Sequence, residues 1–287
     1  MRCALVGSTR RPSDVAVDAD RYRVQVADVR RARLVVAYRG TDFRGFAPNQ
    51  GVRTVMGELV PAVSKVVRQP VELSMAGRTD AGVHAWGQVV SGDVPAVTDL
   101  ADLQRRINKM CAPDITIRSV EWAAADFDAR FSATSRRYRY HVWNDPAPNP
   151  LLHELTWHVH RPLDLDAMQA AAEPLLGEHD FASFCRRPKT PDGMEPASLV
   201  RVVSDATWSR VDDTPMLRFE IAGSAFCHQM VRSIVGTMVD IGIGRIHHTK
   251  MAGILGARSR DAAGGVAPPS GLVLWEVGYD GRRWDAG

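Results

Sequence analysis

The chain has 287 residues, of which 45% are hydrophobic and 24% charged, with a formal net charge of +3. These values are typical of a globular enzyme built as one large domain or as two joined subdomains. No stretch approaches 18 consecutive apolar residues, which excludes a membrane-spanning helix. The apolar run at residues 3–8 is too short, and too soon followed by charges, for a secretory signal.

The four cysteines are Cys3, Cys111, Cys185 and Cys227, and they lie far apart in the sequence. Their spacing matches neither a metal site nor a redox motif. We therefore expect free thiols in a reducing compartment, which indicates a cytoplasmic protein.

Charge is unevenly distributed along the chain. Residues 1–144 contain 22 Lys and Arg against 15 Asp and Glu, a net +7, whereas residues 145–287 contain 14 against 18, a net −4. Nearly all the basic residues are arginines, whose planar guanidinium matches phosphate in geometry and charge. The basic half favours a polyanionic partner, although a solvated surface with scattered charge is the alternative.

The first half begins with residues 1–30, which are polar and weakly periodic, so we expect a flexible extension in which residues 22–26 could form a short strand. Periodicity then predicts strands at 33–38, 71–75, 88–94, 114–123 and 136–144, and helices at 54–67 and 99–110. Pro61 lies inside the first helical pattern and argues against an unbroken helix there.

The second half follows a Pro-rich segment, residues 145–150, which we take as the boundary between subdomains 31–144 and 145–287. A helix capped by Asp164 should run to Gly177, and residues 205–211 and 216–223 should form paired strands. A helix over 227–244 and a buried strand over 271–279 complete the pattern. This mixture of strand pairs and helices predicts an α+β fold with a largely antiparallel sheet.

The helix expected over 227–244 has two unlike faces. One face is apolar, and the other is small and polar, comprising Gln229, Arg232, Ser233, Gly236, Thr237 and Asp240. Small residues permit close contact, so this face should lie against another part of the chain or a ligand.

Several chemistries lack their sequence motifs. There is no phosphate-binding loop, no dinucleotide glycine fingerprint and no G-x-S-x-G motif. The histidines at 153, 158, 160, 247 and 248 have no acidic or cysteine partner at metal-ligand spacing, so we predict no metal site.

The stretch AGRTDAGVHA, residues 76–85, lies between two predicted strands. Gly77 and Gly82 flank Asp80, and glycine permits positive φ and the close approach of a ligand. An ordinary Asp-Gly turn would explain these glycines. It would not explain the whole run, in which Arg78 and His84 lie close to the aspartate.

Residues 77–85, GRTDAGVHA, resemble the signature loop of the TruA family of tRNA pseudouridine synthases. The resemblance continues through FDARFSATSRRYRY (127–140), LLGEHDFASF (175–184), FCHQMVRSIVG (226–236) and GLVLWEVGYD (271–280). It therefore covers about residues 33–280, with the motifs in the family's order. It implies a pseudouridine synthase fold, with two α/β subdomains around a mainly antiparallel central sheet.

The resemblance also implies a reaction and the residues that perform it. The uracil N1–ribose bond is broken, the base turns, and it rejoins the sugar through C5, without any cofactor. Asp80 matches the catalytic nucleophile, acting on the sugar carbon or through a glycal. Tyr138 matches the active-site tyrosine, which stacks on uracil and serves proton transfer at C5. Arg232 matches an arginine that pairs with the aspartate and favours its ionised form.

Other matches concern the substrate. Leu272 matches an apolar residue of the uracil pocket, and Arg78 a residue that contacts RNA and helps extrude the nucleotide. The implied substrate is the tRNA anticodon stem-loop at nucleotides 38, 39 and 40, held by a homodimer. On composition, the further phosphate contacts expected are Arg105, Arg106, Lys109, Arg136 and Arg137.

Two positions depart from the family's pattern. Arg39 stands where the family commonly has aspartate, and Phe46 where it has tryptophan, which could affect RNA contacts or target choice.

Two other functions stay open. A catalytically altered RNA-binding relative would need a damaged site. An aspartate-dependent glycosidase would need a second carboxylate across the scissile bond.

Overall fold

The computed structural model describes residues 28–187, 195 and 197–279. Its strands are β1 (Val29–Tyr38), β2 (Ser74–Met75), β3 (His84–Pro95), β4 (Ile115–Trp122), β5 (Ala133–Trp143), β6 (Trp157–His158), β7 (Gly177–Asp180), β8 (Val200–Arg210), β9 (Met216–Gly223) and β10 (Leu272–Tyr279). Its α-helices are α1 (Val55–Val67), α2 (Leu100–Cys111), α3 (Leu165–Ala172), α4 (Met230–Gly242) and α5 (Met251–Gly256).

The described strands form one sheet in the order β4-β1-β3-β10-β5-β9-β8-β7, with β2 paired to β3 and β6 to β5. Its pairs are antiparallel except β10 with β3 and β5 with β6. The predicted α+β class with a mainly antiparallel sheet is therefore confirmed. Strand β10, from the second half of the chain, lies between β3 and β5 of the first half, so strands from both halves alternate in the described sheet.

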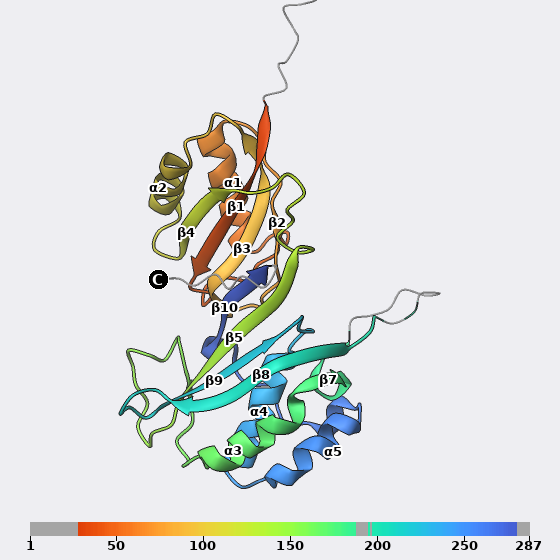
Figure 1. The fold of residues 1–287 in the computed structure, drawn as a ribbon. Coiled ribbons are helices and arrows are strands. Elements are labelled where there is room, and N and C mark those ends of the chain that lie inside the picture. Colours follow the sequence, from red (N-terminus) through yellow and green to blue (C-terminus); the bar gives the residue numbers. More distant parts are fainter. Residues whose placement is uncertain (1–27, 188–194, 196, 280–287) are drawn as a thin grey trace, which may run out of the picture.

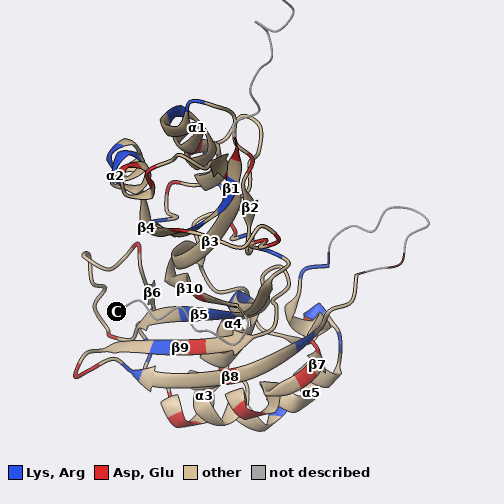
Figure 2. Cartoon of the chain, turned by 45° about the horizontal axis from the view of Figure 1, so that its top comes forward, with Lys and Arg blue, Asp and Glu red and all other residues tan. Residues whose placement is uncertain are grey.

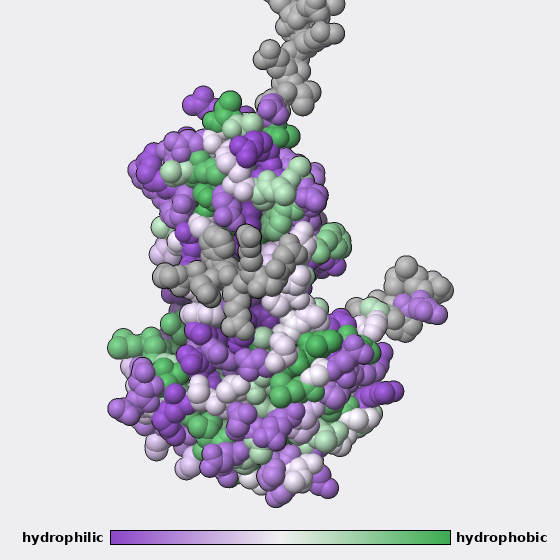
Figure 3. Space-filling model, in the orientation of Figure 1, coloured by the Kyte–Doolittle hydropathy of each residue, from purple (hydrophilic) through white to green (hydrophobic). Residues whose placement is uncertain are grey.

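The helices lie in two groups at opposite ends of this sheet (Figure 1). α1 packs on α2, which packs on β4, whereas α3 packs on α4 and β8. One cluster of buried apolar side chains runs through both halves. On the outside, hydrophilic side chains cover most of the face seen in Figure 3. Among the described residues, no helix is long and apolar enough to cross a membrane.

Several predicted boundaries shift for local reasons. Helix α1 continues through Pro61, which is exposed, although proline has no N–H to donate to the carbonyl four residues earlier. Helix α3 ends at Ala172 rather than reaching Gly177, since Pro174 follows and the chain tightens into a 3₁₀ turn. The extension predicted at residues 1–30 lies outside the described residues, apart from the start of β1. The proposed domain boundary at 145–150 falls in the loop after β5.

Helix α4 begins at Met230, three residues later than predicted, because Gln229 adopts the left-handed conformation, with φ of +64°. The small polar face of α4 packs against the chain itself. A Cβ on Gly236 would lie 1.9 Å from the carbonyl oxygen of Gly265, and the Gly264 amide donates to Thr237 Oγ1 at 2.9 Å. Close packing therefore explains most of that face.

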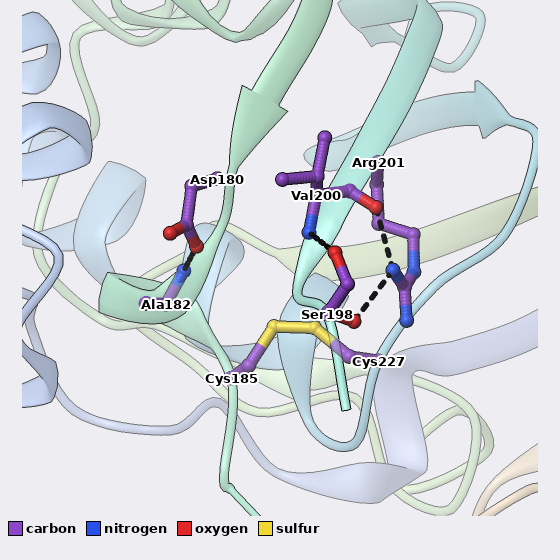
Figure 4. Close-up of a disulfide and its surroundings, with 7 residues drawn as sticks. All are labelled: Asp180, Ala182, Cys185, Ser198, Val200, Arg201 and Cys227. Atoms are coloured by element: carbon purple, nitrogen blue, oxygen red, sulfur yellow. Dashed lines mark hydrogen bonds between the residues drawn. A yellow bond between two sulfur atoms is a disulfide. The ribbon is translucent and has the colours of Figure 1, made fainter. Parts of the chain in front are cut away.

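Two of the cysteines contradict the expectation of free thiols. Cys185 and Cys227 form a disulfide, with their Cα atoms 5.8 Å apart (Figure 4). The pair was not visible in the sequence, because its members are 42 positions apart and become neighbours only through the β8–β9 hairpin. Cys111 is free and buried, and Cys3 lies outside the described residues.

Candidate active site

The Asp80 loop connects β2 to β3 and is held by backbone bonds to the segment after β1. The Phe46 amide donates to the Thr79 carbonyl at 3.2 Å, and the Gly82 amide donates to the Phe43 carbonyl at 3.2 Å. Gly82 has φ of +79°, which L side chains rarely adopt. The loop is thus a fixed turn whose glycine is required by the backbone, as expected for a presented carboxylate.

His84 stabilises this loop from behind. Its Nδ1 accepts from the Gly40 amide at 2.9 Å, so Nε2 carries the proton and donates to the Glu154 carbonyl at 3.0 Å. Burial lowers the pKa of His84, which keeps the ring neutral in this arrangement. His84 therefore connects three segments and is a structural residue.

Asp80 and Arg232 are 152 positions apart and meet in one ion pair. Arg232 Nη1 donates to Asp80 Oδ2 at 3.1 Å, and Arg232 Nε donates to the Ala267 carbonyl at 2.8 Å. The carbonyl fixes one edge of the guanidinium, which leaves the other edge aimed at the carboxylate. Both side chains are mostly shielded, with 13% exposure for Arg232 and 27% for Asp80.

The pair borders a cavity of about 570 Å³, in the usual size range of small-ligand sites. Tyr138 of β5 and Leu272 of β10 also line it. β5 and β10 are neighbours in the sheet, and Tyr138 is paired with Leu274, two residues after Leu272. This register brings Tyr138 and Leu272 to one wall of the cavity. Asp80, Tyr138, Arg232 and Leu272 therefore come together as the sequence predicted.

Tyr138 is held in an apolar wall and stays protonated. Burial raises the pKa of its phenol to about 12, while Arg136 opposes this rise and the negative charge of Asp80 adds to it. Its ring meets Phe226 edge to face, with centroids 5.1 Å apart. A neutral phenol over the cavity can stack on a base and donate a hydrogen bond.

Comparison with known proteins connects this geometry to a family. A family profile described as tRNA pseudouridine synthase matches residues 171–280. A protein of Cutibacterium acnes named tRNA pseudouridine synthase A is 40% identical over 253 residues, covering 87% of this chain and 88% of the relative. Its namesake in Frankia casuarinae is 43% identical over 251 residues, covering 87% and 89%.

The chain belongs to the TruA family of tRNA pseudouridine synthases. It is an isomerase by that membership. Among solved structures, a Cbf5–Nop10–Gar1 complex aligns over 85% of this chain and 49% of the other, at 11% identity and a TM-score of 0.35. The identity to the named relatives over most of the chain, and not this structural likeness, carries the assignment.

The cavity of this TruA-family protein is also lined by residues that the sequence analysis did not single out. His228 Nε2 lies 3.3 Å from Asp80 Oδ1, and Arg44 and Phe226 also line the cavity. His228 and Phe226 stand in the motif FCHQMVR, so the resemblance pointed at their segment without assigning them. Their orientation depends on the left-handed turn at Gln229, which the sequence pattern does not indicate.

Arg78 is exposed and lines both this cavity and a second one of about 360 Å³. The two cavities share Arg78, Tyr138 and Phe226, and the second is also bordered by Arg130 and Arg136. The Arg136 guanidinium donates to four carbonyl oxygens, those of Ala76, Arg130, Ala133 and Ser224. Arg136 therefore shapes the wall, whereas Arg78 is presented on it.

The other arginines named from composition lie away from the cavity. Arg137 forms an ion pair with Asp205 at 2.6 Å on the sheet, and Arg105 and Arg106 pair with Asp102 on α2. Lys109 is exposed on the same helix. Figure 2 shows basic residues on α2 and β5, with acidic residues beside them on α2 and β9.

The two departures from the family's pattern have structural partners. Arg39 pairs with Asp114 at 3.0 Å and Glu154 at 3.1 Å, and it does not line the cavity. Phe46 is fully buried beside the Asp80 loop and also borders the cavity. In the described part of the chain, no cluster of His, Cys, Asp and Glu could hold a metal ion.

Proposed function

We propose that this protein converts uridine to pseudouridine at one or more of nucleotides 38, 39 and 40 in the tRNA anticodon stem-loop. The observation that carries the proposal is the Asp80–Arg232 ion pair on the wall of a cavity that Tyr138 and Leu272 complete. Family membership supports tRNA as the substrate class.

The proposed chemistry needs an ionised carboxylate beside the sugar of a flipped uridine. Arg232 Nη1 donates to Asp80 Oδ2 at 3.1 Å, which places a donor on that oxygen beside the cavity. Asp80 engages the ribose or the base as the N1–C1′ bond breaks, either by attack at C1′ or by removal of a sugar proton. The base then turns and rejoins the sugar through C5. C5 loses its proton to solvent and N1 takes one up, and any proton removed from the sugar is returned, so the product is an isomer of uridine.

Tyr138 and Leu272 hold the base during this rearrangement. Tyr138 provides an aromatic face and a hydroxyl that is neutral, because burial raises its pKa to about 12. Leu272 provides an apolar contact on the same cavity. A phenol that is protonated at neutral pH donates a hydrogen bond in the resting enzyme. Proton transfer from C5 through Tyr138 therefore requires that the bound base, or Asp80, changes the environment of the phenol.

The RNA must present an unstacked nucleotide, because C1′ is unreachable inside a stacked helix. Arg78, which is exposed at the junction of the two cavities, is proposed to contact the RNA there and assist extrusion. Arg105, Arg106, Lys109, Arg136 and Arg137 stay proposals as further RNA contacts. A cytoplasmic homodimer that uses both subunits to hold one tRNA is also proposed, on the family resemblance alone, because the Cys185–Cys227 disulfide removes the free-thiol argument for that location.

The experiment is a map of pseudouridine in unmodified tRNA by chemical probing after incubation with the enzyme. Product confined to nucleotides 38–40 supports the proposal, and product elsewhere contradicts the assigned target. No product on any tRNA, with tight binding retained, favours the alternative of a catalytically altered RNA-binding relative. Light scattering at micromolar concentration tests the homodimer.

A glycosidase is disfavoured by the composition of the cavity. Glycosidases flank the scissile bond with two carboxylates. Among the described residues that line this cavity, Asp80 is the only acidic one. Asp80 therefore has no partner acid among these residues, which suits a reaction that returns the base to the sugar better than hydrolysis.

A further inference from the structure

The segment Phe226–Gln229, between β9 and α4, places His228 against the catalytic carboxylate. His228 Nε2 lies 3.3 Å from Asp80 Oδ1, and Arg232 Nη1 lies 3.1 Å from Asp80 Oδ2. Each oxygen of the carboxylate thus has its own nitrogen neighbour. Arg232 alone would leave the carboxylate free to pivot about its Cβ–Cγ bond, and a second contact on the other oxygen restricts that rotation.

This segment is held firmly although it belongs to a loop. The Arg186 amide donates to the His228 carbonyl at 3.0 Å, and the Met230 amide donates to the Cys227 carbonyl at 3.1 Å. Gln229 keeps a left-handed φ of +64°, which is uncommon for a residue with a side chain. Such a turn persists where neighbouring contacts determine it, as these bonds do.

The disulfide adds a covalent anchor at the residue before His228. It joins Cys227 to Cys185, which is buried and follows the 3₁₀ turn Ala182–Phe184 (Figure 4). That turn is itself fixed, because Ser183 Oγ donates to the Ile254 carbonyl at 2.7 Å. Cys185 therefore connects the cavity wall to a rigid part of the C-terminal half.

We propose that His228 is a positioning residue that orients the Asp80 carboxylate, and that the Cys185–Cys227 disulfide acts through His228 by holding it in place. The inference rests on the proposed function, in which Asp80 is the reacting group. The His228 side chain is 47% exposed, so its contact with Asp80 contributes little to folding stability. Its contribution is to alignment, where displacement of about 1 Å can lower a rate about 10²-fold.

The first test compares His228→Ala and His228→Gln with His160→Ala, an exposed histidine outside the cavity, as the matched control. We expect His228→Ala to lower kcat about 10- to 100-fold. KM for tRNA should stay within about threefold, because the lost contact is to Asp80 and not to RNA. His228→Gln, which keeps a polar nitrogen in its side chain, should recover part of kcat. An unchanged kcat, or a rise in KM alone, would overturn the positioning role.

The second test asks whether the disulfide acts through His228. Reduction with a dithiol breaks the S–S bond and forms two thiols, while the dithiol is oxidised to a disulfide. We expect Cys185→Ser to lower kcat about three- to tenfold, and reduction of the wild type to have the same effect, whereas Cys111→Ser has none. In the His228→Ala background, Cys185→Ser should cause no further loss. Fully additive losses would show that the disulfide does not act through His228.

A structural readout separates this inference from the proposed function. In crystal structures, the Asp80 carboxylate should have one orientation in the wild type and a rotated or divided orientation in His228→Ala. This result would support the positioning role even if no tRNA yielded pseudouridine, an outcome that counts only against the proposed function. The same single orientation in both proteins would contradict the positioning role, whatever the activity.

Discussion

Two groups of arginines in this protein behave differently, although the sequence makes them look alike. Arg78 and Arg232 lie on the cavity wall, where one is exposed and the other faces Asp80. Arg105 and Arg137 already have carboxylate partners on α2 and on the sheet. The composition therefore shows how many basic residues the chain has. The ion pairs formed in the fold determine which of them can still bind a substrate.

Among the arginines, the largest effect should come from the one that contacts Asp80. Arg232→Met should lower kcat about 10²- to 10³-fold, because a buried donor to the charged centre is lost. The Kd for tRNA should change less than about threefold. Steady-state kinetics and filter binding measure the two quantities, with Arg245→Met, which breaks an exposed ion pair with Asp240, as control. If affinity fell and kcat did not, the ion-pair role would be wrong.

Arg136 should affect stability, because its guanidinium satisfies four carbonyl oxygens inside the wall. Arg136→Met leaves these acceptors without their donor, so we expect the free energy of unfolding to fall by about 2–4 kcal/mol. Urea denaturation measures this change. Arg105→Met, which breaks only an exposed pair on α2, should change the free energy of unfolding by less than about 0.5 kcal/mol. Equal effects of the two substitutions would erase the distinction between these arginines.

Arg139 and Arg218, which lie on the sheet, should affect how stability depends on pH, because their charges act on the buried His141. Burial, together with the charges of Arg139 and Arg218, lowers the pKa of His141 to about 4. In the unfolded chain this histidine has a pKa of about 6.5, so the unfolded state binds a proton first as pH falls. Stability should therefore drop by up to about 3 kcal/mol between pH 6.5 and pH 4.

Urea denaturation at a series of pH values measures this acid loss in the wild type and in His141→Gln. The substitution should flatten the curve over that window, since glutamine does not titrate. His84, whose pKa burial also lowers, contributes in the same direction and remains in both proteins. A curve of unchanged slope in His141→Gln would assign the acid loss to other groups.

The smallest effect concerns RNA binding by single arginines. Arg78→Ala should weaken tRNA binding about tenfold and reduce the salt slope by about one unit, because the substitution removes the proposed phosphate contact. Replacing Arg105, Arg106 and Lys109 together should weaken binding less than Arg78→Ala does, since Asp102 already pairs with both arginines. Binding measured between 50 and 200 mM salt compares them. A larger effect on α2 would place the main RNA path there.

Much of the active site was predictable because its parts stand in motifs. The Asp80 loop, Tyr138, Arg232 and Leu272 were each named from residues in the family's order, and the structure brings all four to one cavity. The α+β class followed from strand and helix periodicity, which local burial enforces. Whether these residues play their assigned catalytic roles stays a prediction.

Other features depend on contacts that no local pattern shows. His228 faces Asp80 only because Gln229 turns left-handed and shortens the predicted helix. The Cys185–Cys227 disulfide depends on a hairpin that brings distant positions together. The sequence left the role of His84 open, because only the fold shows that its two ring nitrogens bond to Gly40 and Glu154.

The most direct measurement of the central claim is a single-turnover assay of Asp80→Asn beside the wild type. The substrate is tRNA tritiated at uridine C5, which loses its label when the new C–C bond forms. We expect the asparagine variant to bind tRNA normally and to release tritium at least about 10⁴-fold more slowly, because an amide cannot replace the carboxylate. Release by Asp80→Asn within about tenfold of the wild-type rate would contradict the assignment of Asp80 as the reacting group.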